Sequence, residues 1–268
     1  MKQLFTIENN PASPVQPVLS LRLGNRHLGY SITNPGGDEL YSLAYYRTEE
    51  TDINALEELI ENTDALKNSF YSVQVSWDFT GSALLSSMDH QPEESGTMLK
   101  ALYGTNGQEA VITETISDWQ LYNVYAVPAA LLHKVQQQYP AAHSRHQFSL
   151  AIKQVNASGE NGTMYVDFRP DDFTVVIVKS SRLLLAQTYS YATPVDVVYY
   201  LLKCCTQLHL SQQEIQLQVS GLIDKDSALY KELYQYFLQL EFRESAWQGT
   251  EFPAHFFTNL NDLARCAS

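Results

Sequence analysis

The chain has 268 residues, 44% of them hydrophobic, and a formal net charge of -13. This length and composition allow one large core or two medium ones, which excludes extensive disorder. The negative charge would repel a nucleic-acid backbone, and no window is apolar over the ~20 residues that a membrane-spanning helix needs. We therefore expect neither nucleic-acid binding nor membrane insertion.

The N-terminal sequence and the cysteines indicate where the protein works. The first residues show no apolar run typical of a signal peptide. The chain has three cysteines, which cannot all pair within one chain. Both features are typical of a reducing compartment, so we expect a cytoplasmic protein.

The first elements are three strands and a helix. Met1–Gln16 is polar and broken by prolines, so no regular element is predicted there. Alternating apolar residues then predict three strands, with a tight Asn25-Arg26 turn between the first two. Thr51 or Asp52 can cap a following helix, and another strand comes after it. In order, these elements are Val18–Leu23, Leu28–Thr33, Leu40–Arg47, the helix Asp52–Leu66 and the strand Ser72–Trp77.

The middle of the chain predicts a second group of elements. A weak strand, a helix and a hairpin are expected at Ala83–Ser86, Glu93–Tyr103, Val111–Ile116 and Leu121–Val127. A helix should begin at Pro128 and stop at Pro140, because proline suits the first helical position and cannot continue a helix. Alternation of Phe148, Leu150 and Ile152 predicts a closing strand.

The pattern of three strands, a helix and a strand then occurs a second time. A glycine-rich linker, Ala157–Gly162, precedes it. The predicted elements are strands at Met164–Phe168, Phe173–Lys179 and Leu183–Tyr189, a helix at Pro194–Leu208 and a strand at Ile215–Ser220. Helices at Ser227–Leu240 and Asn259–Cys266 end the chain.

This repeated order resembles the actin-like ATPases of bacteria, the group that includes the cell-division actin homologue and the actin-like type IV pilus assembly protein. The string AVPAALLHKV within Leu121–Tyr139 looks like a strand-to-helix junction of the pilus protein. The resemblance implies an α/β, duplicated actin-like (ribonuclease H-like) fold with two lobes, each a mixed sheet with crossover helices. The lobes would span 1–157 and 158–268, hinged near Gly159–Gly162, with the last helix packing back on the first lobe. It further suggests an uncharacterised bacterial family with degenerate nucleotide loops.

The resemblance also implies where a nucleotide would bind. Each of two hairpins in this fold carries an Asp for magnesium and, two residues later, a Gly that admits phosphate, and a Gly-Gly pair admits the adenosine. Here Arg22 replaces the first Asp, although Gly24 is kept. Asp167 is kept in the second hairpin, but Arg169 replaces its Gly, and only Gly221 remains of the pair. These five positions are the candidate nucleotide-cleft residues, and they are too incomplete for ordinary ATP hydrolysis.

Two functions therefore remain open. The first is a non-catalytic interaction or scaffold protein without a cofactor or metal, which binds a protein partner or self-associates in or around the cleft between the lobes. The alternative is a divergent ATP-binding protein or ATPase that uses ATP and magnesium. Arg22 and Arg169 could hold an anionic ligand directly, or they could pair with surface acids such as Asp171 and Asp172.

Histidines and tyrosines are two further candidate features. His143 and His146 lack a third metal ligand at a suitable spacing, so we expect them in a solvent-exposed loop after Pro140. Adjacent tyrosines such as Tyr199-Tyr200 must expose one ring on a regular element. That exposure favours a protein interface, although partly buried tyrosine is common without one.

Overall fold

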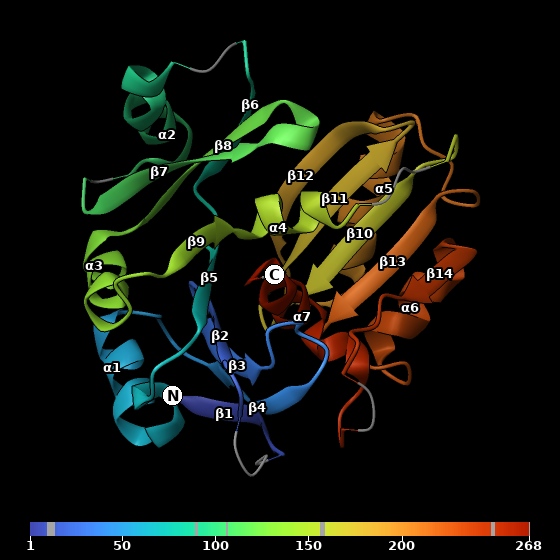
Figure 1. The fold of residues 1–268 in the computed structure, drawn as a ribbon. Helices are drawn as coiled ribbons and strands as arrows, with labels where there is room; N and C mark the ends of the chain where they lie inside the picture. The colour runs from blue at the N-terminus through green and yellow to red at the C-terminus, as the bar shows by residue number, and fades with distance from the viewer. Residues whose placement is uncertain (10–13, 89–90, 106, 156–158, 248–249, 268) are drawn as a thin grey trace. The chain divides into compact units, whose positions relative to one another are not determined.

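A computed structural model describes residues 1–9, 14–88, 91–105, 107–155, 159–247 and 250–267. The chain divides into two compact units (Figure 1). The first consists of Met1–Lys153 with Asp262–Ser268, and the second of Gln154–Asn261. Ala157 and Ser158 of the predicted linker lie outside the described residues.

The first unit is built on a six-stranded sheet. Its strand order is β1-β4-β3-β2-β5-β9, in which β5 runs parallel to β2, β9 runs parallel to β5, and the other pairs are antiparallel. Its strands are β1 (Lys2–Glu8), β2 (Val18–Gly24), β3 (His27–Thr33), β4 (Leu40–Arg47), β5 (Ser72–Asp78) and β9 (His143–His146).

Two helices cover one face of this sheet. Helix α1 (Ile53–Asn62) begins where the Asp52 carboxylate accepts the Ala55 N–H, and this bond lowers the pKa of Asp52. Helix α3 (Ala129–Gln138) lies beside α1. The core between the helices and the sheet includes Leu21, Leu23, Val75, Leu56, Leu59, Leu131 and Val135.

A smaller sheet is inserted between β5 and α3. It has the order β6-β8-β7, formed by β6 (Ser82–Ser86), β7 (Glu109–Ile116) and β8 (Leu121–Pro128). Helix α2 (Ser95–Tyr103) packs on it through Leu99, which contacts Val124 and Ala126. Helix α4 (Gln147–Lys153) follows β9, and a 3-10 turn at Arg265–Ala267 packs on β5.

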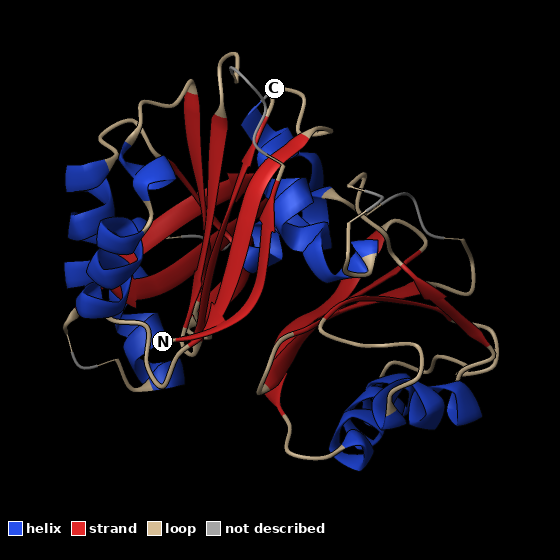
Figure 2. Cartoon of the chain, turned by 90° about the horizontal axis from the view of Figure 1, so that it is seen from below, coloured by secondary structure: helices blue, strands red, loops and turns tan. Residues whose placement is uncertain are grey.

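The second unit has one five-stranded sheet in the order β12-β11-β10-β13-β14. Figure 2 shows its helices on one face of the sheet. The strands are β10 (Thr163–Phe168), β11 (Asp172–Lys179), β12 (Arg182–Ser190), β13 (Gln216–Gly221) and β14 (Gln239–Phe242), and the helices are α5 (Pro194–Gln207) and α6 (Ala228–Tyr236). A short helix, α7 (Thr258–Ala264), lies near the end of the chain.

The two sheets share one topology. The order β4-β3-β2-β5-β9 in the first unit corresponds to β12-β11-β10-β13-β14 in the second, with the same parallel and antiparallel neighbours. The repeat predicted from the sequence is confirmed in the strand order and strand directions of the two sheets. The first unit differs by the inserted small sheet and by β1, which pairs with the outer edge of β4.

Three sequence predictions were wrong. Residues 1–16 contain β1, whose side chains are mostly exposed, so that no apolar alternation marks it. The closing strand is β9, and residues 148–152 belong to helix α4. Alternation misled there because the polar Ser149 between Phe148 and Leu150 is also buried. The helix predicted to reach Leu240 ends at Tyr236, because Phe237 is extended and Leu240 pairs within β14.

Candidate functional site

The first hairpin ends in a tight turn that packs a histidine against a glycine. Gly24 pairs with His27 across the Asn25-Arg26 turn, as predicted. A Cβ on Gly24 would lie 2.1 Å from Cε1 of the imidazole, so a larger residue would displace the ring. His27 also stacks on Tyr45 with ring centroids 5.8 Å apart. Gly24 therefore makes room for a side chain of the protein itself.

Arg22 forms a buried ion pair at the same end of the sheet. Its Nε donates to Oδ2 of Asp78 at 2.5 Å, and Nε2 of His27 lies 3.1 Å from the same oxygen. Ser76 Oγ donates to Oδ1 of Asp78 at 2.7 Å. Arg22 is 2% exposed and Asp78 is 1% exposed. The expectation that Arg22 pairs with a surface acid is wrong, since its partner is a buried acid at the end of β5.

Asp78 was not predicted from the sequence, although a signal for it existed. Strands β2 and β5 are parallel, and their register places Gly24 beside Asp78. Parallel neighbours end at the same edge of a sheet, so an acid directly after the apolar β5 run could have been placed near this hairpin.

The second hairpin holds a similar arrangement. Arg169 is 1% exposed, and its Nε bonds to Asp172, as the surface-acid interpretation predicted, although the arginine itself is buried. Its Nη1 donates to Thr174 Oγ1 at 2.8 Å and lies 3.8 Å from Oδ2 of Asp167. Ser220 Oγ donates to Oδ1 of Asp167 at 2.9 Å. The retained acid is thus engaged by neighbouring protein groups.

Gly221 has a conformation that glycine adopts readily. Its φ is +78°, and a Cβ there would lie 2.1 Å from the carbonyl oxygen of Phe168, its partner in β10. The next residue, Leu222, donates its N–H to that same carbonyl at 2.9 Å. The close approach of β10 and β13 thus accounts for this glycine without a ligand.

The five candidate residues fall into two groups. Arg22 and Gly24 lie at the end of β2, and Asp167, Arg169 and Gly221 lie together at the matching ends of β10 and β13. Their role in holding a nucleotide stays a prediction.

The histidines are structural where they are buried. His143 and His146 lie in β9, so their predicted loop placement is wrong. The backbone N–H of Phe148 donates to Nδ1 of His146, and Nε2 of that ring lies 2.9 Å from the Phe79 carbonyl. A carbonyl only accepts, so Nε2 carries the proton and the ring is neutral. Among the described residues, no group of three or more His, Cys, Asp or Glu side chains is placed to hold a metal.

His255 in the second unit is also buried. Its Nε2 donates to the carbonyl of Ile223 at 2.7 Å, and its ring stacks on Phe242 with a centroid distance of 3.9 Å. Burial lowers the pKa of His255 below its ordinary value. The neutral ring is therefore part of the packing.

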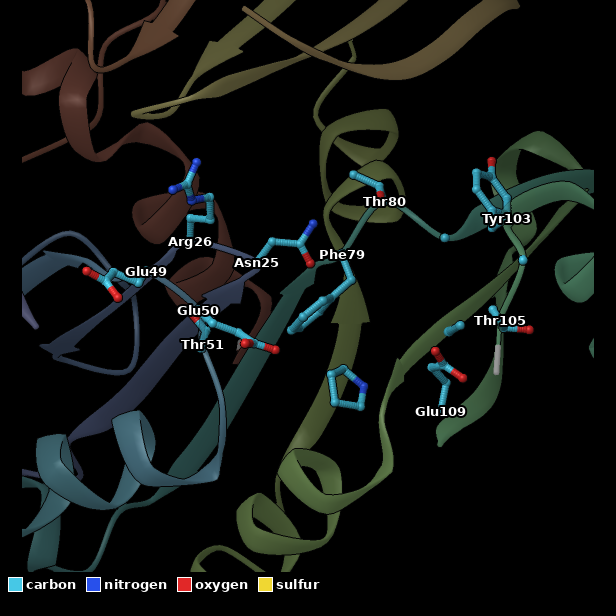
Figure 3. Close-up of a pocket in the computed structure, with 14 residues that line it drawn as sticks. Asn25, Arg26, Glu49, Glu50, Thr51, Phe79, Thr80, Tyr103, Thr105 and Glu109 are labelled. Atoms are coloured by element: carbon cyan, nitrogen blue, oxygen red, sulfur yellow. The ribbon is translucent and has the colours of Figure 1, made fainter. Parts of the chain in front are cut away.

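The first unit contains a pocket of about 440 Å³ beside the first hairpin (Figure 3). The Asn25-Arg26 turn, the loop from β4 to α1, the chain after β5 and the small sheet all line it. Its charged lining residues are Arg26 and three acids, Glu49, Glu50 and Glu109. The pocket is therefore suited to a positively charged group and would repel phosphate.

Backbone hydrogen bonds fix the wall of this pocket. Thr51 N–H donates to the Asn25 carbonyl and Thr48 N–H to that of Arg26, both at 2.9 Å. Tyr103 donates its hydroxyl to the Ser82 carbonyl at 2.5 Å, and burial raises the pKa of that hydroxyl. No sequence pattern indicates this pocket, because its residues come from separate segments.

Comparison with known proteins places the chain in a family. Residues 8–240 match the model of a family described as a protein of unknown function (DUF3822). The chain belongs to this DUF3822 family. No curated protein matches it significantly.

Solved structures show the fold of this DUF3822 protein. A Bacteroides thetaiotaomicron protein with an actin-like ATPase fold and unknown function is 21% identical, with a TM-score of 0.79 over 94% of this chain and 96% of that one. PilM, in the PilM-PilN type IV pilus biogenesis complex, is 12% identical, with a TM-score of 0.61 over 95% and 99%. The ethanolamine utilization protein EutJ from Carboxydothermus hydrogenoformans is 10% identical, with a TM-score of 0.54 over 96% and 92%. The predicted actin-like ATPase fold is confirmed.

No helix in the described part of the chain has the length and hydrophobicity to cross a membrane.

Proposed function

We propose that this chain is a cytoplasmic, non-catalytic protein of the actin-like fold that acts by binding another protein. The observation that carries the proposal is that each hairpin holds a buried arginine in an ion pair, Arg22 with the buried Asp78 and Arg169 with the partly exposed Asp172. A phosphate-binding hairpin needs open backbone N–H groups and a carboxylate available for magnesium. Each hairpin here holds an arginine that a carboxylate of the same unit already neutralises.

The energetic cost of breaking these ion pairs argues against the two arginines acting as phosphate ligands. Removing one partner of a buried ion pair typically costs about 3–5 kcal/mol, because the other charge is left without compensation. For Arg22 to bind a phosphate, it would first have to leave the buried carboxylate of Asp78, which Ser76 and His27 also contact. The binding energy of a nucleotide would be reduced by this cost.

The pocket beside the first hairpin supports a protein partner. Glu49, Glu50 and Glu109 line a space that could accept a lysine or arginine side chain from an extended segment. A precedent exists in the same fold, since PilM has been solved in a complex with PilN. We therefore expect a partner with a basic segment that docks in this pocket.

The second candidate is a divergent ATP-binding protein. It is favoured by Asp167, whose side chain keeps 17% of its surface exposed beside Arg169. This carboxylate could still orient a hydrated magnesium ion.

A thermal-shift titration with ATP and magnesium separates the two functions. The first predicts no magnesium-dependent rise in the melting temperature, since only a ligand that binds the native state raises it. A clear rise that disappears in Asp167→Ala would establish nucleotide binding and overturn the proposal.

Co-purification tests the pocket. A tagged chain carrying Glu49→Lys, Glu50→Lys and Glu109→Lys should lose a partner that the unchanged chain retains. The matched control is Glu93→Lys with Glu94→Lys, two exposed acids that do not line the pocket. If the pocket variant and the control both retain every bound protein, the pocket is not the docking site.

A further inference from the structure

The sheet of the second unit ends in a strand with one neighbour. Strand β12 pairs with β11 on one side, and no strand of the described residues pairs with its other side. Figure 1 shows this strand at the edge of its sheet. Along an edge strand, about half of the backbone N–H and C=O groups point away from the sheet and can pair with another chain.

In the first unit, an additional strand covers the equivalent edge of the sheet. Strand β4 is the equivalent of β12, and β1 adds to its outer side in an antiparallel pair that runs from Lys2 opposite Arg47 to Glu8 opposite Ser42. The second unit has no equivalent of β1 among its described residues. The fold thus accepts an antiparallel strand at this position, and the second unit does not supply one.

The composition of β12 favours pairing. Its interior, LLLAQTY, holds no charge and no proline, and these residues are all partly exposed. Exposed edges of natural sheets usually carry such charges or prolines to prevent association. One bulge is present, because Ile177 pairs with Leu185 while Val178 pairs with Leu183. The segment from Leu185 onward is regular.

The charges at the ends of β12 suit a second copy of the same strand. At one end, Arg182 pairs with Lys179, so two positive side chains lie together. At the other end, Ser190 pairs with Asp172, which is engaged by Arg169, and Asp171 before it adds a further negative charge. Antiparallel pairing of two β12 strands would place each positive end beside a negative end, and the twofold symmetry would repeat the match.

We propose that two copies of this chain associate through antiparallel pairing of their β12 strands, which joins the two five-stranded sheets into one. The net charge of -13 opposes most other contacts between copies, since like charges would meet. The uncharged interior of β12 avoids this repulsion. This inference goes beyond the proposed function, because it uses none of the pocket residues.

The test is the mass of the full chain in solution, measured by sedimentation from low to high micromolar concentration. A dimer is expected. Gln187→Lys should weaken it at least about tenfold, because lysine on an edge strand places like charges across the pairing. The matched control, Gln239→Lys, puts the same change on β14, the opposite edge of the sheet, and should leave the dimer intact.

Hydrogen exchange provides a second measurement that needs no variant. The amides of Leu185–Ser190 should exchange more slowly at high protein concentration, and those of β14 should not change. A chain that stays monomeric throughout, a dimer that Gln187→Lys leaves unchanged, equal weakening by both lysines, or exchange in β12 that does not depend on concentration would each overturn the inference.

Discussion

The ion pair between Arg22 and Asp78 yields a prediction about stability. Arg22→Met keeps the apolar stem and removes the guanidinium, which leaves a buried carboxylate with hydrogen bonds from Ser76 and His27. Because both original partners are at most 2% exposed, water cannot replace the lost charge. We expect a loss of about 3–5 kcal/mol in the free energy of unfolding. At roughly 2–4 °C per kcal/mol, the melting temperature should fall by about 10 °C.

A double-mutant cycle decides whether the charge is the cause. Arg22→Met with Asp78→Leu removes both charges, so it should be more stable than Arg22→Met alone. Calorimetry of the full chain measures the unfolding of each variant. Arg47→Met, at the exposed end of β4, is the control and should change stability by less than about 1 kcal/mol. If the losses of the two single variants simply add in the double variant, the argument from an uncompensated buried charge is wrong.

Three further predictions concern a glycine, a histidine and two thiols. Gly221→Ala should destabilise the protein by at least about 2 kcal/mol in chemical denaturation, because of its positive φ and the nearby carbonyl. Gly159→Ala, with nothing within 4 Å of its new Cβ, should change little, and equal effects would contradict this reasoning. Because the native pKa of His255 lies below the ordinary 6.5, the unfolded state binds more protons as the pH falls through that value. Stability should therefore decrease from pH 7 to pH 5 by more in the unchanged chain than in His255→Gln, and parallel profiles would refute this. Burial raises the pKa of Cys204, and that of Cys205 to about 11, so neither thiol should react quickly with a thiol reagent at neutral pH until the chain is denatured. Rapid labelling of either one in the native protein would be the contrary result.

Local patterns in the sequence identified most of the repeated elements. Strands β2, β3, β10 and β11 were predicted because one face of each is apolar and short turns separate them. Helix α5 was predicted from its amphipathic pattern and from Thr193, and the structure shows that Thr193 forms a capping box with Asp196. These signals depend on neighbours within a few residues, which the sequence displays directly.

Elements that depend on distant pairing were the ones that failed. Strand β1 is defined by its bonds to β4, some forty residues away in the chain, and its own side chains carry little pattern. Helix α4 is buried on most sides, so that its polar Ser149 marked no exposed face. Apolar alternation alone therefore did not distinguish a buried helix from a strand at this position.

The candidate site also combines features that the sequence displays with features that depend on tertiary contacts. The repeat, the fold class and the replacement of an acid by Arg22 and of a glycine by Arg169 could all be recognised in the sequence. The role of those arginines depends on three-dimensional contacts, since Asp78 lies 56 residues from Arg22 and meets it because β2 and β5 are parallel neighbours. The acidic pocket and the edge of β12 depend on such contacts too, because both are formed by which segments come together and which do not.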